Sequence, residues 1–396
     1  MRDPETDPWL TLIGLGEDGP AGLSPASRAA LDAAEVIFGG PRHLDLIRAG
    51  DKGQAWPVPF DPTPVLAHRG KPVVVLASGD PFWFGAGGSL MAHLVPGEWT
   101  SHPAPSSFQL AANRLGWRLE DTLCLGLHAA PFARLRPVLG RGVRAICTVR
   151  DGVAVAELAR WLTANGHANA RLTVLERLGG PKERIRLIRP GDVPSDVTAP
   201  VSVAIEATET GLPGSSGLPD DLFQHDGQLT KRPVRALTLS ALAPRKGEVL
   251  WDIGAGSGSI GIEWLLDGGG TVEALEADPV RAARARGNVA AFGLTHRHRL
   301  HEARAPEGLD ALPAPDAVFI GGGASDALLS RLWDLLPAGA RLVMNAVTIE
   351  TEVLVLDWSA RHGGSLLKIE LAEPVAIGAK RGWRSALPIL QWSVTR

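Results

Sequence analysis

The stretch 249–260, with the sequence VLWDIGAGSGSI, constrains the fold of this chain more than any other. Its apolar beginning predicts a buried strand. Glycines follow, and after them apolar residues recur at the spacing of one helical face: Ile260, Ile262, Leu265 and Leu266. A glycine loop between a strand and a helix can reach positive φ, bring a ligand against the backbone and offer unpaired N–H groups. We therefore expect an α/β domain with a ligand loop at this strand end.

The spacing of the glycines separates two kinds of cofactor. A dinucleotide loop would read G-x-G-x-x-G from Gly254 and would place glycine or alanine at position 259, where this chain has Ser259. An acid followed by G-x-G-x-G is instead the form seen in S-adenosylmethionine-dependent methyltransferases. The predicted cofactor-binding residues of this loop are Asp252, Gly254, Ala255, Gly256, Ser257 and Gly258.

A second strand is expected over residues 271–275. Glu276 ends it, and its carboxylate is placed to accept hydrogen bonds from both ribose hydroxyls of an adenosine. The alternative is an ordinary strand–turn–helix unit with an exposed surface acid. The strand–turn–helix context of both loop and acid favours adenosylmethionine.

Length and charge set limits on the rest of the chain. At 396 residues it is long enough for two or three domains, and its net charge of −3 argues against a nucleic-acid partner held by a basic surface. No run approaches the roughly 18 apolar residues of a membrane span, and residues 1–7 lack a signal-peptide pattern. We therefore expect a cytoplasmic protein with no membrane partner. The absence of tyrosine excludes a phenol as acid or base.

A second glycine pattern lies near the N-terminus. A strand over 9–13 runs into Gly14, Gly16 and Gly19, which have the spacing of a dinucleotide fingerprint. However, Ser24 and Pro25 form a good N-cap and N1 pair, so the next helix is expected to start too late for that motif. We therefore do not favour nicotinamide binding here.

Two further strand ends carry small or turn-forming residues. A strand over 72–77 is followed by Ser78, Gly79 and Asp80, and a short apolar segment leads to Ser106 and Ser107. In an open α/β sheet, ligands bind at the carboxyl ends of the strands. The alternative is a set of ordinary turns.

The motifs LIGLGEDG, ASGDPFWFG and PAPSSFQLAANRLG, in this order, resemble those of the tetrapyrrole methylases. The resemblance continues through 146–148 and 175–184, and implies two α/β lobes with adenosylmethionine in the cleft between them. By match, the cleft is lined by Gly14, Gly16, Ser78, Gly79, Asp80, Ser106 and Ser107. The sequence departs from the family at 128–130, where His-Ala-Ala replaces the frequent His-Gly-Arg.

The second half is similar to the decarboxylating precorrin methyltransferases through GLPDDLF, LTKRPVRA, DIGAGSGS, RAPEGL, FIGGG and VMNAVTIET. These motifs add Thr230, as a helix cap or a hydroxyl facing the cofactor, and Ala305 to the cofactor-binding residues. The expected organisation is a two-lobed methylase domain over 1–205, a glycine- and proline-rich linker over 206–217, and a Rossmann-like methyltransferase domain over 218–396. The fold class is thus α/β throughout, with one adenosylmethionine per domain.

Together the two resemblances imply methylation of a precorrin at carbons 5 and 15, with loss of carbon dioxide from the ring C acetate. The first domain would methylate carbon 5, and the second would methylate carbon 15 and decarboxylate. Asn345, Thr348 and Glu350, at the expected end of a strand, are candidates for the catalytic groups by position, with strand-end turn chemistry as the alternative for Asn345 and Thr348. The histidines at 296, 298 and 301 lack metal-ligand spacing with cysteine or carboxylate, so we predict no metal.

Two other functions compete with this interpretation. An RNA methyltransferase would present a basic face, which the net charge disfavours. A non-catalytic adenosylmethionine-binding regulator would bind the cofactor without transferring its methyl group. Whether the chain is a monomer or a homo-oligomer is left open by the sequence.

Overall fold

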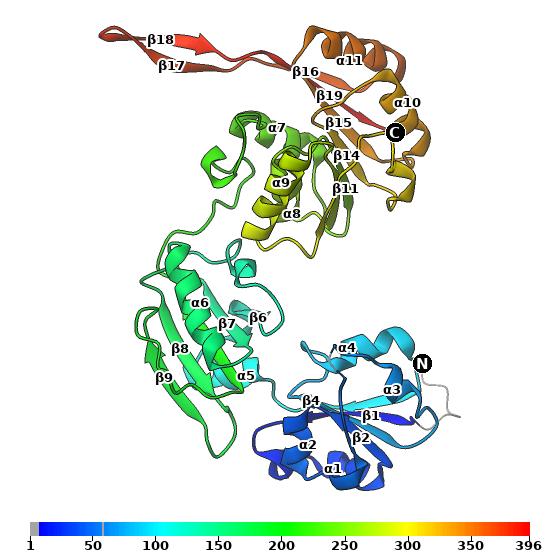
Figure 1. The fold of residues 1–396 in the computed structure, drawn as a ribbon, viewed down its shortest axis with the longest axis vertical. Helices are drawn as coiled ribbons and strands as arrows, with labels where there is room; N and C mark the ends of the chain where they lie inside the picture. Colours follow the sequence, from blue (N-terminus) through cyan, green and yellow to red (C-terminus); the bar gives the residue numbers. More distant parts are fainter. Residues whose placement is uncertain (1–7, 58) are drawn as a thin grey trace. The chain divides into compact units, whose positions relative to one another are not determined.

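The computed structural model of the chain describes residues 8–57 and 59–396; residues 1–7, on which the prediction of no signal peptide rests, lie outside it. The chain forms two compact units (Figure 1). The first comprises Met1–Phe132 and Leu139–Thr210, and the second comprises Ala133–Val138 and Gly211–Arg396. The short segment Ala133–Val138 thus groups with the second unit, although the sequence predicts it within the first domain.

The first unit begins with a parallel sheet in the order β3-β2-β4-β1-β5. Its strands are β1 (Leu10–Leu15), β2 (Val36–Gly39), β3 (Gly53–Ala55), β4 (Val73–Ser78) and β5 (Trp99–His102). Its helices are α1 (Pro25–Ala33), α2 (Pro41–Ile47), α3 (Thr63–Leu66), α4 (Ala86–Leu90) and α5 (Ser107–Leu115). The central strands β1 and β4 are almost wholly buried, as their continuous apolar runs predict for a sheet covered on both faces. Ser24 caps α1 by accepting the Ser27 N–H at 3.1 Å, which confirms the late helix start.

A second, mixed sheet completes the first unit, in the order β6-β7-β10-β8-β9. It consists of β6 (Leu123–Gly126), β7 (Arg144–Val149), β8 (Arg171–Glu176), β9 (Arg184–Ile188) and β10 (Val201–Glu206), with α6 (Gly152–Ala164) beside it. The fully buried carboxylate of Glu176 accepts hydrogen bonds from Arg184 and Arg186, which fixes the β8–β9 pair. Two sheets in one unit fit the expected two-lobed methylase fold.

The second unit contains a seven-stranded sheet in the order β13-β12-β11-β14-β15-β19-β16. Its strands are β11 (Val249–Ile253), β12 (Thr271–Leu275), β13 (His298–His301), β14 (Ala317–Ile320), β15 (Arg341–Ala346), β16 (Ser365–Ile369) and β19 (Ile389–Thr395). Its helices are α7 (Arg232–Leu242), α8 (Ser259–Leu266), α9 (Pro279–Ala291), α10 (Asp326–Leu335) and α11 (Ile349–His362). The strand order reverses between β11 and β14, and in such sheets the ligand crevice lies at the carboxyl ends of these two strands. The expected Rossmann-like methyltransferase fold is confirmed.

A buried ion pair holds the beginning of the second unit in place. Glu263 on α8 is 1 % exposed and accepts the backbone N–H groups of Gly217 at 2.6 Å and Leu218 at 3.0 Å. Arg235 on α7 is fully buried and donates to Glu263 and to the carbonyl of Leu218. Leu212, inside the predicted linker, packs against the core of this unit, so the linker is not wholly separate from it.

Residues 379–384, which include Lys380, Arg381, Trp383 and Arg384, lie on a separate hairpin formed by β17 (Ala372–Ile377) and β18 (Lys380–Ser385). Figure 1 shows this hairpin projecting from the sheet of the second unit. Its Trp383 side chain is exposed. Among the helices that the structure describes, none is long and apolar enough to cross a membrane.

Candidate active sites

The first unit contains a cavity of about 490 Å³ between its two sheets. The carboxyl ends of β1 and β4 and the start of α5 supply part of its wall. Of the predicted cofactor residues, Gly16, Ser78, Gly79, Ser106 and Ser107 line this cavity, whereas Gly14 and Asp80 are not among its lining residues. The structure thus brings residues from three predicted motifs to one cavity.

Gly14 and Asp80 have structural positions instead. A Cβ atom on Gly14 would lie 1.7 Å from the carbonyl oxygen of Gly79, so the loop after β4 can approach β1 only because residue 14 is glycine. Asp80 uses its carboxylate to accept the Phe82 N–H at 2.8 Å, which fixes the turn after β4. Ser106 also has a local role, since it caps α5 in a capping box with Gln109.

A polar network that the sequence did not predict lies on one wall of the cavity. Glu17 forms ion pairs with Arg42 and Arg177. Arg42 donates to the Ser78 hydroxyl at 3.0 Å and contacts Nε2 of His43 at 2.7 Å, and that nitrogen also lies 2.9 Å from the Ser78 oxygen. Burial, with the nearby charge of Arg42, lowers the pKa of His43 to about 4. His43 is therefore neutral near pH 7.

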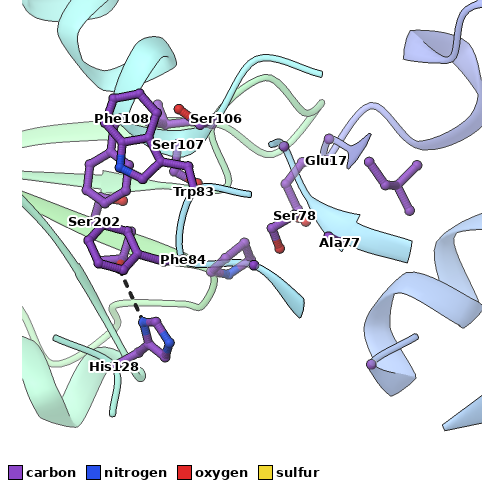
Figure 2. Close-up of a pocket in the computed structure, with 18 of the residues that line it drawn as sticks. Glu17, Ala77, Ser78, Trp83, Phe84, Ser106, Ser107, Phe108, His128 and Ser202 are labelled. Carbon is purple, nitrogen blue, oxygen red and sulfur yellow. Dashed lines mark hydrogen bonds between the residues drawn. The ribbon is translucent and has the colours of Figure 1, made fainter. Parts of the chain in front are cut away.

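Aromatic side chains form another part of the wall (Figure 2). Trp83 stacks on Phe108 with ring centroids 5.5 Å apart, and Phe84 lies against the same ring at 5.6 Å. His128, at the departure from the family pattern, also lines the cavity and contacts the hydroxyl of Thr148 at 3.4 Å. The run Phe-Trp-Phe at 82–84, which follows Asp80 and Pro81, was the signal in the sequence that could have drawn attention to this wall.

In the second unit, the glycines of the predicted loop adopt backbone conformations that other residues rarely reach. The φ angles are 71° at Gly254, 59° at Gly256 and 75° at Gly258. A Cβ on Gly254 would lie 2.8 Å from the backbone nitrogen of Gly322, so the loops after β11 and β14 touch at the point where the strand order reverses. No atom lies within 4 Å of a Cβ placed on Gly256, so a ligand can approach the backbone there.

Glu276 lies directly beside this loop. Its side chain accepts the N–H of Gly256 at 2.8 Å and the N–H of Asp278 at 2.9 Å, one on each carboxylate oxygen. Each oxygen therefore keeps a lone pair for a further donor, such as a ribose hydroxyl. Glu276 is only 7 % exposed, so it is not the exposed surface acid of the alternative interpretation.

Asp252 is placed differently from a ligand-contacting residue. It is 1 % exposed, its Oδ2 accepts the Gly261 N–H at 3.2 Å, and its Oδ1 has no hydrogen-bond partner among the described residues. Burial and the nearby charge of Glu276 raise the pKa of Asp252 to about 7, against the lowering effect of the Gly261 hydrogen bond. Asp252 therefore lies inside the fold and accepts a hydrogen bond from the first turn of α8.

The remaining predicted cofactor residues are two in the loop, Ala255 and Ser257, and two from other segments, Thr230 and Ala305. Ala255 packs against the core, and the carbonyl of Ser257 accepts a hydrogen bond from Asn288 at 2.9 Å. Thr230 is not the helix cap, because Lys231 occupies that position and Thr230 instead offers its carbonyl to Arg235. Ala305 is partly buried against the core.

The predicted catalytic residues lie at the end of β15 and the start of α11. The Asn345 amide donates to the Thr238 hydroxyl at 2.9 Å and accepts from Gln391 at 2.9 Å. Thr348 caps α11 by accepting the Thr351 N–H. Glu350 is exposed in the first turn, where hydrogen bonds from its own backbone N–H and from the Thr348 hydroxyl lower its pKa. Glu350 is therefore ionised near pH 7 and is better suited to accept a proton than to donate one.

The histidines at 298 and 301 have different surroundings. His301 contacts the buried carboxylate of Glu273 at 2.8 Å, whereas His298 is 6 % exposed and burial lowers its pKa to about 4. Within residues 8–57 and 59–396, no three His, Cys, Asp or Glu side chains gather in a group that could hold a metal ion.

Comparisons with known proteins match both units. Residues 10–192 match the model of the Tetrapyrrole (Corrin/Porphyrin) Methylases, and residues 221–396 match that of the Precorrin methyltransferase domain. A Sinorhizobium protein described as precorrin-6Y C(5,15)-methyltransferase [decarboxylating] is 47 % identical over 98 % of this chain and 97 % of its own length. A Mycobacterium tuberculosis protein of the same description is 39 % identical over 98 % of this chain and 100 % of its own length.

Among solved structures, the C-terminal domain of precorrin-6Y C5,15-methyltransferase from Rhodobacter capsulatus is 50 % identical. It covers 47 % of this chain and 100 % of that domain, with a TM-score of 0.46. The two full-length relatives span both units in a single chain, which confirms the family predicted from the order of the motifs. The chain therefore belongs to the S-adenosylmethionine-dependent precorrin-6Y C(5,15)-methyltransferases (decarboxylating).

Proposed function

We infer that this chain methylates precorrin-6Y at carbons 5 and 15 and removes carbon dioxide from the ring C acetate, as a step of cobalamin biosynthesis. The observation that carries the inference is the identity to relatives of that description across both units, 47 % over 98 % of the chain in one case. The expected cytoplasmic location and the choice between monomer and homo-oligomer stay predictions.

We further propose that each unit binds its own adenosylmethionine, the first for carbon 5 and the second for carbon 15 with decarboxylation. Two unlike candidate sites support this division: a cavity of about 490 Å³ in the first unit and a glycine loop at the strand-order reversal in the second. The cavity volume lies within the roughly 300–1,000 Å³ typical of small-molecule sites.

In the first unit, the proposed donor-binding wall consists of Gly16, Ser78, Gly79, Ser106 and Ser107, all of which line the cavity. Gly14 contributes indirectly, because its missing side chain lets the Gly79 loop close over β1. Asp80 likewise acts by holding the turn through Phe82.

In the second unit, we propose that the backbone at Gly254, Gly256 and Gly258 receives the donor and that Glu276 accepts its ribose hydroxyls. The space over Gly256 and the remaining lone pairs of Glu276 fit such a ligand. We keep Ala255 and Ser257, which belong to this loop, and Thr230 and Ala305 as further proposed contacts. Asp252 supports the loop from inside the fold, since it is buried.

Adenosylmethionine, when bound, supplies an electrophilic methyl group to an electron-rich carbon of the macrocycle. The protein therefore needs no covalent nucleophile. Its task is to align the acceptor carbon with the methyl group and to exclude water, which the walls of the two sites can do by position alone.

Decarboxylation breaks the bond between the acetate methylene and its carboxylate, the conjugated macrocycle takes up the electron pair, and a proton replaces the lost carbon dioxide. We propose that the edge formed by Asn345, Thr348 and Glu350 faces the acceptor in this step. The lowered pKa of Glu350 favours a role in accepting a proton or a hydrogen bond. The proton donor is not assigned to any of the three.

Two matched variants test the proposed division of labour. Gly256→Leu places a side chain where the donor is proposed to lie; Gly247→Leu introduces the same strain at φ 87°, also with no atom within 4 Å, before β11. We expect Gly256→Leu to bind one donor equivalent per chain and to release a product methylated once with its acetate retained. Gly247→Leu should bind two equivalents and form the fully methylated, decarboxylated product.

The following results would contradict these proposals. A single donor equivalent in the unmodified chain, or decarboxylation that survives in Gly256→Leu, would refute the proposed second site. Donor binding without any methyl transfer to a precorrin would favour the regulatory alternative, and methylation of tRNA would favour the RNA methyltransferase.

A further inference from the structure

The side chain of Phe84 is unusual in both backbone and exposure. Its φ angle is 56°, a region that bulky residues seldom adopt. Its ring is 54 % exposed although it belongs to a cavity wall. A strained backbone that presents an apolar ring towards a cavity is a feature that folding alone does not require, and such strain concentrates at functional sites.

Neighbouring contacts hold this segment in shape. The Asp80 carbonyl accepts the Trp83 N–H at 3.2 Å, and the Pro81 carbonyl accepts the Gly87 N–H at 3.0 Å. A Cβ on Gly85 would lie 2.4 Å from the Pro81 oxygen, so the chain turns back closely on itself directly after Phe84. The direction of the Phe84 ring is therefore set by the turn around it.

The ring of Phe84 lies against the second sheet of the first unit. A Cβ on Gly126, at the end of β6, would lie 2.9 Å from Cδ1 of Phe84, so only glycine allows this approach. The ring centroid of Phe84 lies 5.6 Å from that of Phe108, and in Figure 2 His128 lies below the Phe84 ring. Of the residues proposed to bind the donor, Gly16, Ser78 and Gly79 lie at the ends of β1 and β4 of the other sheet, and Ser106 and Ser107 lie at the start of α5.

The polar groups of the cavity match a flat molecule with acidic substituents. Arg42, Arg150, His43 and His128 line it, and Glu17 is already paired with Arg42. A conjugated macrocycle with carboxylate side chains would place its face on an aromatic ring and its acids near the arginines. Adenosylmethionine carries a single carboxylate, on its methionine part, and so offers no such rim of acids.

We propose that Phe84 is the side chain on which the face of the tetrapyrrole stacks in the first unit. This inference rests on the proposed function of that unit. Phe84 thereby determines the position and affinity of the acceptor, while the donor is held by Gly16, Ser78, Gly79, Ser106 and Ser107.

The test compares Phe84→Leu with Phe82→Leu in the full-length chain, following the carbon 5 product by mass with precorrin-6Y and adenosylmethionine. Phe82 follows Asp80 in the same turn and is 42 % exposed, but it packs on Trp99 and is not among the cavity-lining residues. We expect Phe84→Leu to raise the KM for the tetrapyrrole about tenfold, with the KM for adenosylmethionine unchanged. Phe82→Leu should leave both constants unchanged, and Phe84→Tyr should restore the wild-type KM.

A further variant separates stacking from backbone strain. Because glycine accepts a positive φ, Phe84→Gly should unfold at a temperature no lower than Phe84→Ala, while both have the raised KM. An unchanged tetrapyrrole KM in Phe84→Leu, an effect on the adenosylmethionine KM alone, or an equal effect of Phe82→Leu would overturn the inference. If the unmodified chain forms no product methylated at carbon 5, the proposed function of the unit fails instead.

Discussion

Each unit holds a carboxylate near the end of the first strand of its sheet, and the two carboxylates have opposite electrostatic settings. In the first unit, the Glu17 side chain is 9 % exposed and contacts the guanidinium groups of Arg42 and Arg177. In the second, Asp252 is 1 % exposed, accepts one backbone N–H and is close enough to Glu276 to be repelled by it. The comparison teaches that partners, and not position at a strand end, decide whether a buried acid stabilises the fold in its charged form.

The second unit contains its own counterpart of Glu17. Glu263 is as buried as Asp252, yet it faces the guanidinium of Arg235 and two backbone N–H groups. Neutralising substitutions should therefore destabilise the chain at Glu263 and Glu17 and stabilise it at Asp252. The following predictions test this difference in sign.

The largest effect is expected for Glu263→Gln, because it leaves Arg235 buried without a compensating charge. We expect the second unit to lose about 3–5 kcal/mol of unfolding free energy. Hydrogen exchange followed by mass spectrometry can assign the loss to peptides of α7, α8 and the segment before them. The control is Glu302→Gln, which removes an exposed ion pair with Arg286 and should change stability by only a few tenths of a kcal/mol. Equal effects of the two substitutions would mean that the buried pair contributes nothing.

Asp252→Asn is expected to act in the opposite direction and to depend on pH. The folded pKa of about 7 lies above the ordinary aspartate pKa of 3.8, so the stability contributed by the protonated acid is complete below about pH 4 and is lost as the pH rises towards 7. Asparagine stays neutral and so avoids this loss. The unfolding free energy of the variant relative to the wild type should therefore rise by about 2 kcal/mol as the pH rises from 5 to 8. Urea unfolding at a series of pH values measures the difference, with exposed Asp334→Asn as the control. A difference that does not change with pH would contradict the raised pKa.

His298→Gln should show the reverse dependence on pH. Burial lowers the folded pKa of His298 to about 4 from the ordinary histidine pKa of 6.5, so the wild type loses stability as the pH falls below about 6.5. The variant should therefore gain up to about 2 kcal/mol over the wild type at pH 4.5 and little at pH 8. In the wild type, His298 and Asp252 oppose each other between about pH 4 and 6.5, so each variant should expose the slope of the other residue. The same series of urea titrations serves both variants; parallel wild-type and variant curves would refute the prediction.

A smaller loss is expected for Glu17→Gln in the first unit. Arg42 and Arg177 are 36 % and 35 % exposed, so water screens much of the charge that the substitution leaves behind. We expect a loss of about 1 kcal/mol, seen as faster hydrogen exchange around β1 and α2. Exposed Glu120→Gln in the same unit is the control. A gain in stability would place Glu17 in the same class as Asp252 and break the comparison.

The smallest effect is expected for Thr348→Ala, which tests whether a polar group at a strand end is structural or chemical. Thr348 caps α11 and Ser325 caps α10, each through a backbone N–H three residues ahead. Loss of either cap should cost about 1 kcal/mol or less. We expect Thr348→Ala and Ser325→Ala to reduce stability similarly, and only Thr348→Ala to slow decarboxylation as well, because its hydroxyl belongs to the edge proposed to face the acceptor. Equal decarboxylation rates in the two variants would remove Thr348 from that edge.

The sequence predicted local features well where a short stretch determines them. The strands 249–253 and 271–275 have the bounds expected from their apolar runs, and Ser24 caps α1 as its position before Pro25 indicates. These features depend on periodicity and capping, which a few consecutive residues specify.

Contacts between distant residues could not be predicted in the same way. Glu17, Arg42 and Ser78 meet only because β1, β2 and β4 end at one edge of a sheet whose strand order is not written in any local pattern. Asp252 looked like a ligand residue because it precedes the glycines, yet its side chain faces the interior. The left-handed backbone of Phe84 could not be predicted either, because phenylalanine ordinarily avoids that conformation.

The contacts of Glu263 also define where the second unit must begin if it is to be produced alone. Its carboxylate is satisfied partly by the N–H groups of Gly217 and Leu218, and Arg235 is satisfied partly by the Leu218 carbonyl. The family match starts at residue 221, so a fragment cut there would lose these partners; Arg235 and Glu263 would keep each other but lack the hydrogen bonds that satisfy the rest of the pair in the core. The boundary of a stable fragment is therefore set by hydrogen bonds to Gly217, Leu218 and Asp220, which lie before that match.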